Sequence, residues 1–115
     1  MSKIDVGFIA KIRYSLDEVQ KNYVSANKDA IRQTAAELTF YEMEDKEDGA
    51  ILRIMKMNPA LRYYINFYND SIIVTGIAEK LGSLKNFPEI AMAEIAALIG
   101  NATKGNTPNA SQYAT

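Results

Sequence analysis

The sequence predicts an α+β fold, in which one antiparallel β-sheet of about five strands is joined by an N-terminal and a C-terminal helix. Three observations lead to this prediction. Apolar residues alternate with period two at the start of the chain, and a long stretch without Gly or Pro follows with apolar residues at helical spacing. Several strand-like segments separated by turn residues then precede a final apolar helix. The predicted order of elements is therefore β-α-β-β-β-β-α.

The first strand and the first helix are predicted from periodicity. Apolar side chains alternate through residues 4–14, which indicates a strand with one buried face. Ser15 and Glu18 have the spacing of a capping box, so a helix is expected to begin there. Apolar residues recur at helical spacing over residues 16–37, which predicts one continuous helix.

Four strands are predicted in the middle of the chain, because segments rich in strand-forming residues alternate with turn residues. They cover residues 38–44, 50–57, 61–68 and 71–78. If each turn fixes the pairing of its two strands, Leu38 faces Ile54, Phe67 faces Leu52, and Phe67 also faces Ile72 on its other side. All three pairings place the same set of apolar residues on one face. This face holds Leu38, Phe40, Leu52, Ile54, Ile65, Phe67, Ile72 and Val74.

The opposite face of the predicted sheet carries the side chains best suited to binding. Arg offers planar donors for phosphate or carboxylate, and Tyr offers a ring for stacking. Two interpretations stay open: the chain's own helices cover this face, or the face binds single-stranded RNA or another protein. The residues expected to contact a partner are Arg53, Arg62, Tyr64, Asn66, Tyr68, Tyr41 and Thr75. The same face also holds Thr39, Met43, Ile51, Met55 and Ile73.

The last predicted helix follows a linker at residues 82–85 and runs from Asn86 to about Ile99, where Gly100 ends it. Its interior is apolar on nearly every side, so one face is expected to pack on the sheet and the other to meet a second subunit. The expected subunit contacts are Ile90, Met92, Glu94, Ile95, Leu98 and Ile99. Residues 1–100 form the predicted domain, and residues 101–115 form a flexible tail or one that a partner orders.

The composition argues against several classes of function. Cys and His are absent, so disulfides, thiolate chemistry and histidine catalysis are excluded. The 13 Lys+Arg residues nearly balance the 14 Asp+Glu residues, which gives no overall attraction to nucleic acid or membrane. No segment has the length and hydropathy of a membrane span, and the acidic residues near position 45 lack the spacing of a calcium loop. We therefore expect a cytoplasmic protein without catalytic activity, cofactor or metal.

The arrangement of residues 38–115 resembles the coat proteins of small single-stranded RNA phages. The shared features are a meandering antiparallel sheet, an apolar helix at 87–99 and a short tail of small polar residues. The resemblance implies a self-assembling shell subunit, found in the virion, whose helices interlock a dimer and whose sheet face binds RNA hairpins. The positions that match the RNA-binding face are Arg53, Arg62, Tyr64, Asn66, Tyr68 and Thr75. The predicted helix at 16–37 stands where that family has an N-terminal hairpin.

Two alternative functions remain. The segment 94–101 is similar to the helix of chemotaxis-type phosphatases, which carries a Glu and, three residues later, an Asn. Here Glu94 matches the Glu, but Ala97 stands at the position of the Asn. The other alternative is a small adaptor or inhibitor that binds a protein through the Tyr and Arg residues of its sheet face. The leading expectation is a non-catalytic, self-assembling protein whose partners are itself and RNA.

Overall fold

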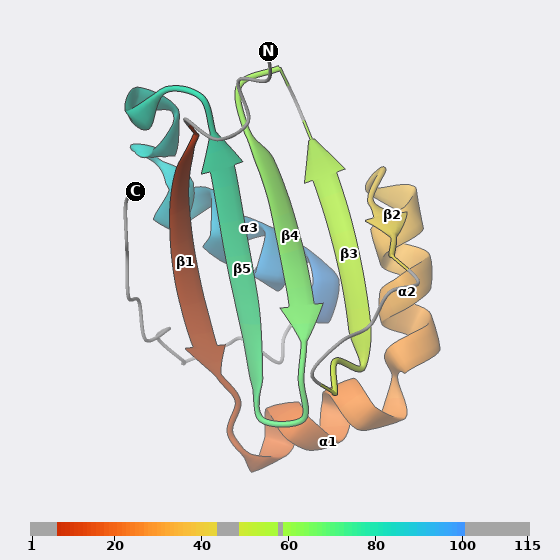
Figure 1. Ribbon diagram of the computed structural model, residues 1–115. Coiled ribbons are helices and arrows are strands. Elements are labelled where there is room, and N and C mark those ends of the chain that lie inside the picture. Colours follow the sequence, from red (N-terminus) through yellow and green to blue (C-terminus); the bar gives the residue numbers. More distant parts are fainter. Residues whose placement is uncertain (1–6, 44–48, 58, 101–115) are drawn as a thin grey trace.

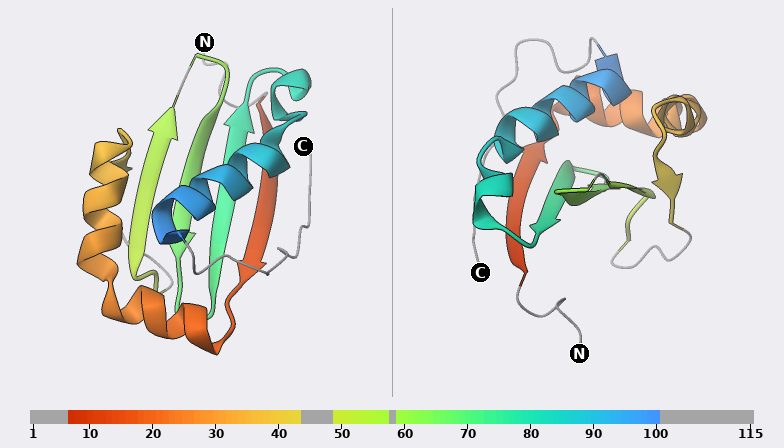
Figure 2. Two further views of the ribbon diagram at one scale, coloured as in Figure 1. Left: turned by 180° about the vertical axis from the view of Figure 1, so that it is seen from behind. Right: turned by 90° about the horizontal axis from the view of Figure 1, so that it is seen from above.

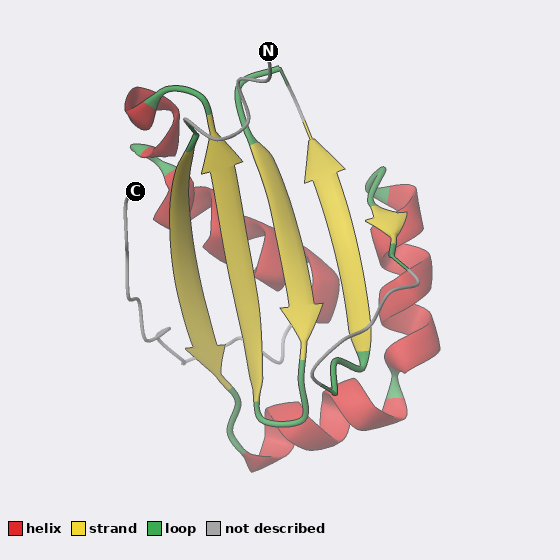
Figure 3. Ribbon diagram, viewed as in Figure 1, coloured by secondary structure: helices red, strands yellow, loops and turns green. Residues whose placement is uncertain are grey.

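The computed structural model describes residues 7–43, 49–57 and 59–100, which form an α+β fold around one five-stranded antiparallel sheet (Figure 1). The strands lie in the order β1-β5-β4-β3-β2. The predicted fold class is therefore confirmed. The strands are β1 (Phe8–Ser15), β2 (Tyr41–Glu42), β3 (Leu52–Met57), β4 (Arg62–Phe67) and β5 (Ser71–Ala78). The helices are α1 (Glu18–Ala26), α2 (Lys28–Glu37), the short 3₁₀ helix η2 (Leu81–Leu84) and α3 (Phe87–Ile99), shown in red in Figure 3.

The helices leave one face of the sheet open. Seen from behind, α3 crosses the sheet diagonally, while α1 lies at one end and α2 lies beside β2 (Figure 2). The view from above places the long helices on the same side of the sheet. Apolar side chains from the strands and helices fill the space between these two layers, and Ile65, Phe67 and Ile95 are fully enclosed there. The core therefore lies on one side of the sheet.

The register of the central strands agrees with the register predicted from the turns. Leu52 pairs with Phe67 and Ile54 pairs with Ile65 across β3 and β4. The β4–β5 hairpin closes with a hydrogen bond from Tyr68 N to Ser71 O (2.8 Å), so Phe67 pairs with Ile72 as expected. Strand β1 pairs with β5 along its whole length, which places it at the edge of the sheet.

The pairing predicted for the segment at 38–44 is wrong. Tyr41 pairs with Met55, so the strand is displaced by four residues from the expected pairing of Leu38 with Ile54. Leu38 instead ends α2, and Thr39 has a φ of +66°, which turns the chain sharply. This left-handed turn leaves only two residues for β2. Phe40 is buried as predicted.

The first helical region also differs from the single helix predicted at 16–37. Asn27 has a φ of −121°, outside the helical range, and its side-chain amide donates to the carbonyl of Tyr23 (2.9 Å). This bond stops α1, and α2 begins at the next residue. The capping box is formed by Asp17 and Gln20, which lie two residues further along the chain than the predicted pair Ser15 and Glu18.

The N-terminal end of α1 is fixed by a buried glutamine. Gln20 is fully enclosed; its side-chain oxygen accepts from the backbone N–H of Asp17 (3.0 Å), and its amide donates to the hydroxyl of Tyr14 (2.9 Å). The backbone N–H of Gln20 in turn donates to Asp17 Oδ1 (2.9 Å). The helix start is thereby tied to β1, because Tyr14 belongs to that strand.

The C-terminal helix has the predicted bounds. Gly100 caps the end, as expected, and Pro88 lies in the first turn, but the side chain of Asn86 makes no capping bond. The 3₁₀ helix η2 overlaps the predicted linker at 82–85 and begins one residue before it. The expected tail at 101–115 and most of the predicted turn at 45–49 lie outside the described residues.

Candidate functional site

The candidate site is the sheet face that the described helices leave uncovered, which we call the open face. Successive side chains of a strand point to opposite faces, so every second residue points to the open face. Directly paired residues of neighbouring strands share a face, so the register gives its members. The open face consists of Ile9, Lys11, Arg13, Tyr41, Arg53, Met55, Met57, Arg62, Tyr64, Asn66, Ile73, Thr75 and Ile77. None of these side chains is buried. Neither α1 nor α2, which together replace the predicted first helix, lies over this face (Figure 2).

The strand register arranges the open face in rows that run across the sheet. The middle row contains Lys11, Thr75, Tyr64, Met55 and Tyr41 in that order. The row towards the N-terminal end of β5 contains Arg13, Ile73, Asn66 and Arg53. The third row contains Ile9, Ile77, Arg62 and Met57. A cation thus lies in every row, and the aromatic rings lie in the middle row.

The charge of the open face is positive, although the whole chain has a formal net charge of −1. Its cations are Lys11, Arg13, Arg53 and Arg62, and no described strand places an acidic side chain beside them. Lys11 and Arg62 form no hydrogen bond or ion pair with any described residue. These two cations can therefore meet an external anion without first losing an internal partner.

The other two cations are held in place by neighbours. Arg53 donates from Nε to Asn66 Oδ1 (2.7 Å), which is the residue directly opposite it on β4. Arg13 donates to Ser15 Oγ (2.6 Å) and lies 3.8 Å from a carboxylate oxygen of Asp70 at the edge of the face. These contacts orient the guanidinium groups, which keep further donors for a ligand.

All seven residues that the sequence predicted for partner contacts lie on this face or at its margin. Tyr41, Arg53, Arg62, Tyr64, Asn66 and Thr75 belong to its rows, and Tyr68 follows β4 directly and is half-buried. The prediction missed Lys11 and Arg13, because it did not decide which strand pairs with β1. The alternation in residues 4–14 had already placed both cations on the side away from Ile12 and Tyr14.

The residues predicted for subunit contacts lie mostly inside their own chain. Ile95, Leu98 and Ile99 are buried against the sheet, while Ile90 and Met92 are half-buried at the edge of the core. The exposed positions of α3 are occupied by Glu89, Ala93, Ala96 and Ala97. Most of the large apolar side chains of α3 are therefore enclosed by one copy, and its outward surface is made of Glu89 and small residues.

Glu94 points towards the sheet and takes part in an internal cluster. Its carboxylate accepts a hydrogen bond from the hydroxyl of Tyr63 and lies 3.4 Å from Lys56 Nζ. Lys56 also lies 5.0 Å from the centre of the Phe40 ring, which packs edge-on against Tyr63. Burial, the hydrogen bond to Glu94 and the charge of Glu94 all raise the pKa of Tyr63 above its ordinary value. The cluster joins α3 to β3 and β4.

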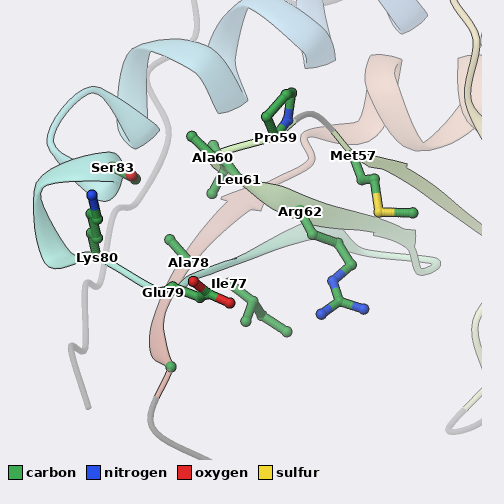
Figure 4. Close-up of a pocket in the computed structure, with 11 residues that line it drawn as sticks. Met57, Pro59, Ala60, Leu61, Arg62, Ile77, Ala78, Glu79, Lys80 and Ser83 are labelled. Atoms are coloured by element: carbon green, nitrogen blue, oxygen red, sulfur yellow. The ribbon is translucent and has the colours of Figure 1, made fainter. Parts of the chain in front are cut away.

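A pocket of about 650 Å³ opens where the open face meets the end of the sheet (Figure 4). It lies between the β3–β4 connection, the end of β5 and η2. Met57, Arg62 and Ile77 belong both to the pocket and to the third row of the open face. The remaining lining residues are Gly7, Pro59, Ala60, Leu61, Ala78, Glu79, Lys80 and Ser83.

Within the described part of the chain, no three acidic side chains gather closely enough to hold a metal ion. None of its helices combines the length and the apolar character needed to cross a membrane.

Comparison with known proteins identifies no family for this chain. No model of a known protein family matches the chain, and no curated protein sequence matches it.

Proposed function

We propose that this chain is a non-catalytic binding protein whose open face binds single-stranded RNA. The observation that carries the proposal is the composition of that face: cations in every row, aromatic rings in the middle row, and no acidic side chain from the described strands. An unstructured RNA strand presents both a chain of phosphates and a series of flat bases. Proteins bind such strands by combining a cationic surface with stacking side chains.

The cations are spaced to follow a strand across the sheet. Lys11 and Arg13 lie on the β1 edge, and Arg53 lies three strands away on β3. Neighbouring strands are about 4.8 Å apart, so these cations span roughly 14 Å. A single strand that crosses the sheet can therefore place several phosphates against positive side chains.

The aromatic residues lie between these cations. Tyr64 is half-exposed at the centre of the middle row, flanked by Thr75 and Met55, and Tyr41 ends the row with 64% of its surface exposed. A base that stacks on a tyrosine ring gains about 1–3 kcal/mol. Such stacking accepts any base, so it supports affinity without strong dependence on sequence.

The proposal is tested by fluorescence anisotropy with a labelled single-stranded decanucleotide RNA at low salt. Lys11→Ala with Arg53→Ala removes two cations from the open face and should weaken binding at least tenfold. Lys21→Ala with Lys28→Ala removes the same charge from α1 and α2, on the other side of the sheet, and should change binding little. Equal losses in both double variants, or no binding by the unaltered protein at low salt, would refute the proposal.

A second candidate is a protein-binding face, because apolar side chains share the surface with the cations. Met57 is 58% exposed and Ile9 is 37% exposed, and both lie in the third row. Exposed Met and Tyr side chains together with Arg are typical of protein interfaces. Ile9→Ala should leave RNA affinity within about twofold if RNA is the partner, whereas a protein partner that packs on this apolar side chain would lose much of its affinity.

We also propose self-assembly into a shell, with the subunit contacts restricted to the outward surface of α3. Beyond Glu89, the outward surface of α3 consists of alanines, so copies would meet there through close helix contacts. A shell subunit would be found in the virion, and a monomeric or dimeric RNA-binding protein would be found in the cytoplasm. Light scattering at high protein concentration separates these cases, because a shell contains many subunits.

A further inference from the structure

The pocket at the end of the sheet has a charge pattern of its own. Arg62 and Lys80 lie on opposite sides of it, and Glu79 lies between them (Figure 4). None of these three side chains forms a hydrogen bond or ion pair with a described residue. Glu79 is also the one acidic residue among the lining residues. Across the pocket, the charged groups therefore lie in the order cation, carboxylate, cation.

The rest of the lining is mainly apolar. Met57 and Ile77 lie on either side of Arg62 in the third row and give the lining its larger apolar side chains, while Ala60 and Ala78 contribute small apolar surfaces. A volume of about 650 Å³ lies within the range of small-ligand sites. The pocket therefore has room for a flat ring against its apolar wall in addition to charged groups at its sides.

A simple anion does not match this pattern, because Glu79 would repel it between the two cations. A ligand that matches carries negative charge at two separated positions and a hydrogen-bond donor between them. One nucleotide unit within an RNA strand has this order: a phosphate on its 5′ side, a base, and a phosphate on its 3′ side. The amino group of cytosine, adenine or guanine supplies a donor that a carboxylate accepts.

We propose that this pocket binds one nucleotide of the RNA strand, with its two flanking phosphates at Arg62 and Lys80 and the amino group of its base at Glu79. The inference rests on the proposed function, since the strand would reach the pocket along the third row of the open face. It also predicts a base preference that the stacking residues of the open face do not provide. Uracil has no amino group and offers only its ring N3–H as a donor, so it is the disfavoured base where the carboxylate meets the position of the amino group.

The test uses nucleoside 3′,5′-bisphosphates, which reproduce one nucleotide with both phosphates. Cytidine 3′,5′-bisphosphate should shift the NMR amide signals of Ala60, Ala78 and Ser83. It should bind about fivefold or more tightly than uridine 3′,5′-bisphosphate. Glu79→Gln should remove this difference, because a neutral amide both donates and accepts. Arg62→Ala and Lys80→Ala should each weaken binding several-fold, whereas Lys21→Ala on α1 should not.

The inference is overturned if cytidine 3′,5′-bisphosphate leaves these amide signals unchanged, or if inorganic phosphate occupies the pocket as well as the nucleotide does. Its failure can be told apart from failure of the proposed function. A decanucleotide RNA that shifts the amides of Tyr64 and Arg53, with no response to the bisphosphate, rejects the pocket alone. A bisphosphate that enters the pocket, with no binding of the decanucleotide, rejects the open face and leaves the pocket as a nucleotide site.

Discussion

The ring of Phe87 closes over Gly76 so tightly that no larger residue fits beneath it. A Cβ atom on residue 76 would lie 2.6 Å from Cε1 of Phe87, a distance that neighbouring carbon atoms do not reach. Gly76 belongs to β5 and Phe87 is the first residue of α3, and both are buried. This contact sets how closely the start of α3 approaches the sheet.

Gly76→Ala should therefore destabilise the protein by about 1–3 kcal/mol, because the buried Phe87 ring must move away from the sheet. Urea unfolding followed by circular dichroism measures the loss. Gly82→Ala is the matched control, since a Cβ there meets nothing within 4 Å, and its effect should be small. If the steric explanation is correct, the smaller side chain in Phe87→Leu should recover part of the stability lost in Gly76→Ala. A Gly76→Ala protein as stable as the Gly82→Ala protein would contradict it.

The buried Gln20 gives a second stability prediction. Gln20→Ala removes the side-chain hydrogen bonds to Asp17 N and to Tyr14, and leaves the Tyr14 hydroxyl without this partner in the core. The expected loss is about 2–3 kcal/mol, because a lost cap and an unsatisfied buried group both contribute. Thermal unfolding of Gln20→Ala and of Gln33→Ala, an exposed position on α2, measures the difference. Equal melting temperatures for these two variants would show that the buried contacts contribute nothing.

Most of the fold could be predicted from the sequence because the signals were local. The turn at Asn69 and Asp70 fixes the β4–β5 register, and the alternation of apolar residues fixes which face is buried. The register of β2 could not be predicted in this way. It depends on the left-handed turn at Thr39, a conformation that a β-branched residue seldom adopts and that local propensity argues against.

The residues of the open face were predicted for β2, β3, β4 and β5, and those on β1 were missed. Hairpin turns reveal only pairings between consecutive strands, whereas β1 pairs with β5 through a contact distant in sequence. The extent to which its own chain buries α3 was not predicted, for a related reason. The sequence shows Ile95 and Leu98 as apolar but does not show that the curved sheet and α2 enclose them. Enclosure depends on tertiary packing, which periodicity alone does not describe.

The Glu94 cluster predicts a dependence of stability on alkaline pH. The pKa of Tyr63 is raised in the folded protein from its ordinary value of 10.0, so the folded state holds the hydroxyl proton more tightly than the unfolded state does. The resulting stability is fully present below pH 10 and is lost as the pH rises through the higher folded-state pKa. Urea midpoints measured from pH 8 upwards should therefore fall above pH 10.

Tyr63→Phe should remove much of this alkaline loss, because phenylalanine has no proton to release. Tyr41→Phe is the matched control, since Tyr41 is largely exposed, and it should retain the pH dependence of the unaltered protein. If Tyr63→Phe and Tyr41→Phe show the same profile, the link between Tyr63 and Glu94 does not govern stability at high pH.

Glu94 itself should act through stability and not through contacts between subunits. Glu94→Ala leaves the hydroxyl of the buried Tyr63 and the ammonium of Lys56 without their shared partner, at a cost of about 1–3 kcal/mol. Glu94→Gln keeps an acceptor for Tyr63 and should cost less. Chemical unfolding gives both values, and sedimentation should show the same mass for both variants as for the unaltered protein. A change of mass in Glu94→Gln without loss of stability would place this residue at an interface instead.

The salt dependence of RNA binding tests how many cations of the open face meet phosphate. For single strands, the logarithm of the binding constant falls with the logarithm of the salt concentration by roughly 0.7 for each phosphate that is neutralised. Lys11 has no internal partner among the described residues, so Lys11→Ala should reduce this slope by roughly 0.7. Tyr64→Phe keeps the stacking ring and adds no charge, so it should leave the slope unchanged. Anisotropy titrations over a series of salt concentrations measure both slopes. If Lys11→Ala lowers affinity while the slope stays constant, Lys11 does not contact a phosphate, and the strand must cross the sheet away from the β1 edge.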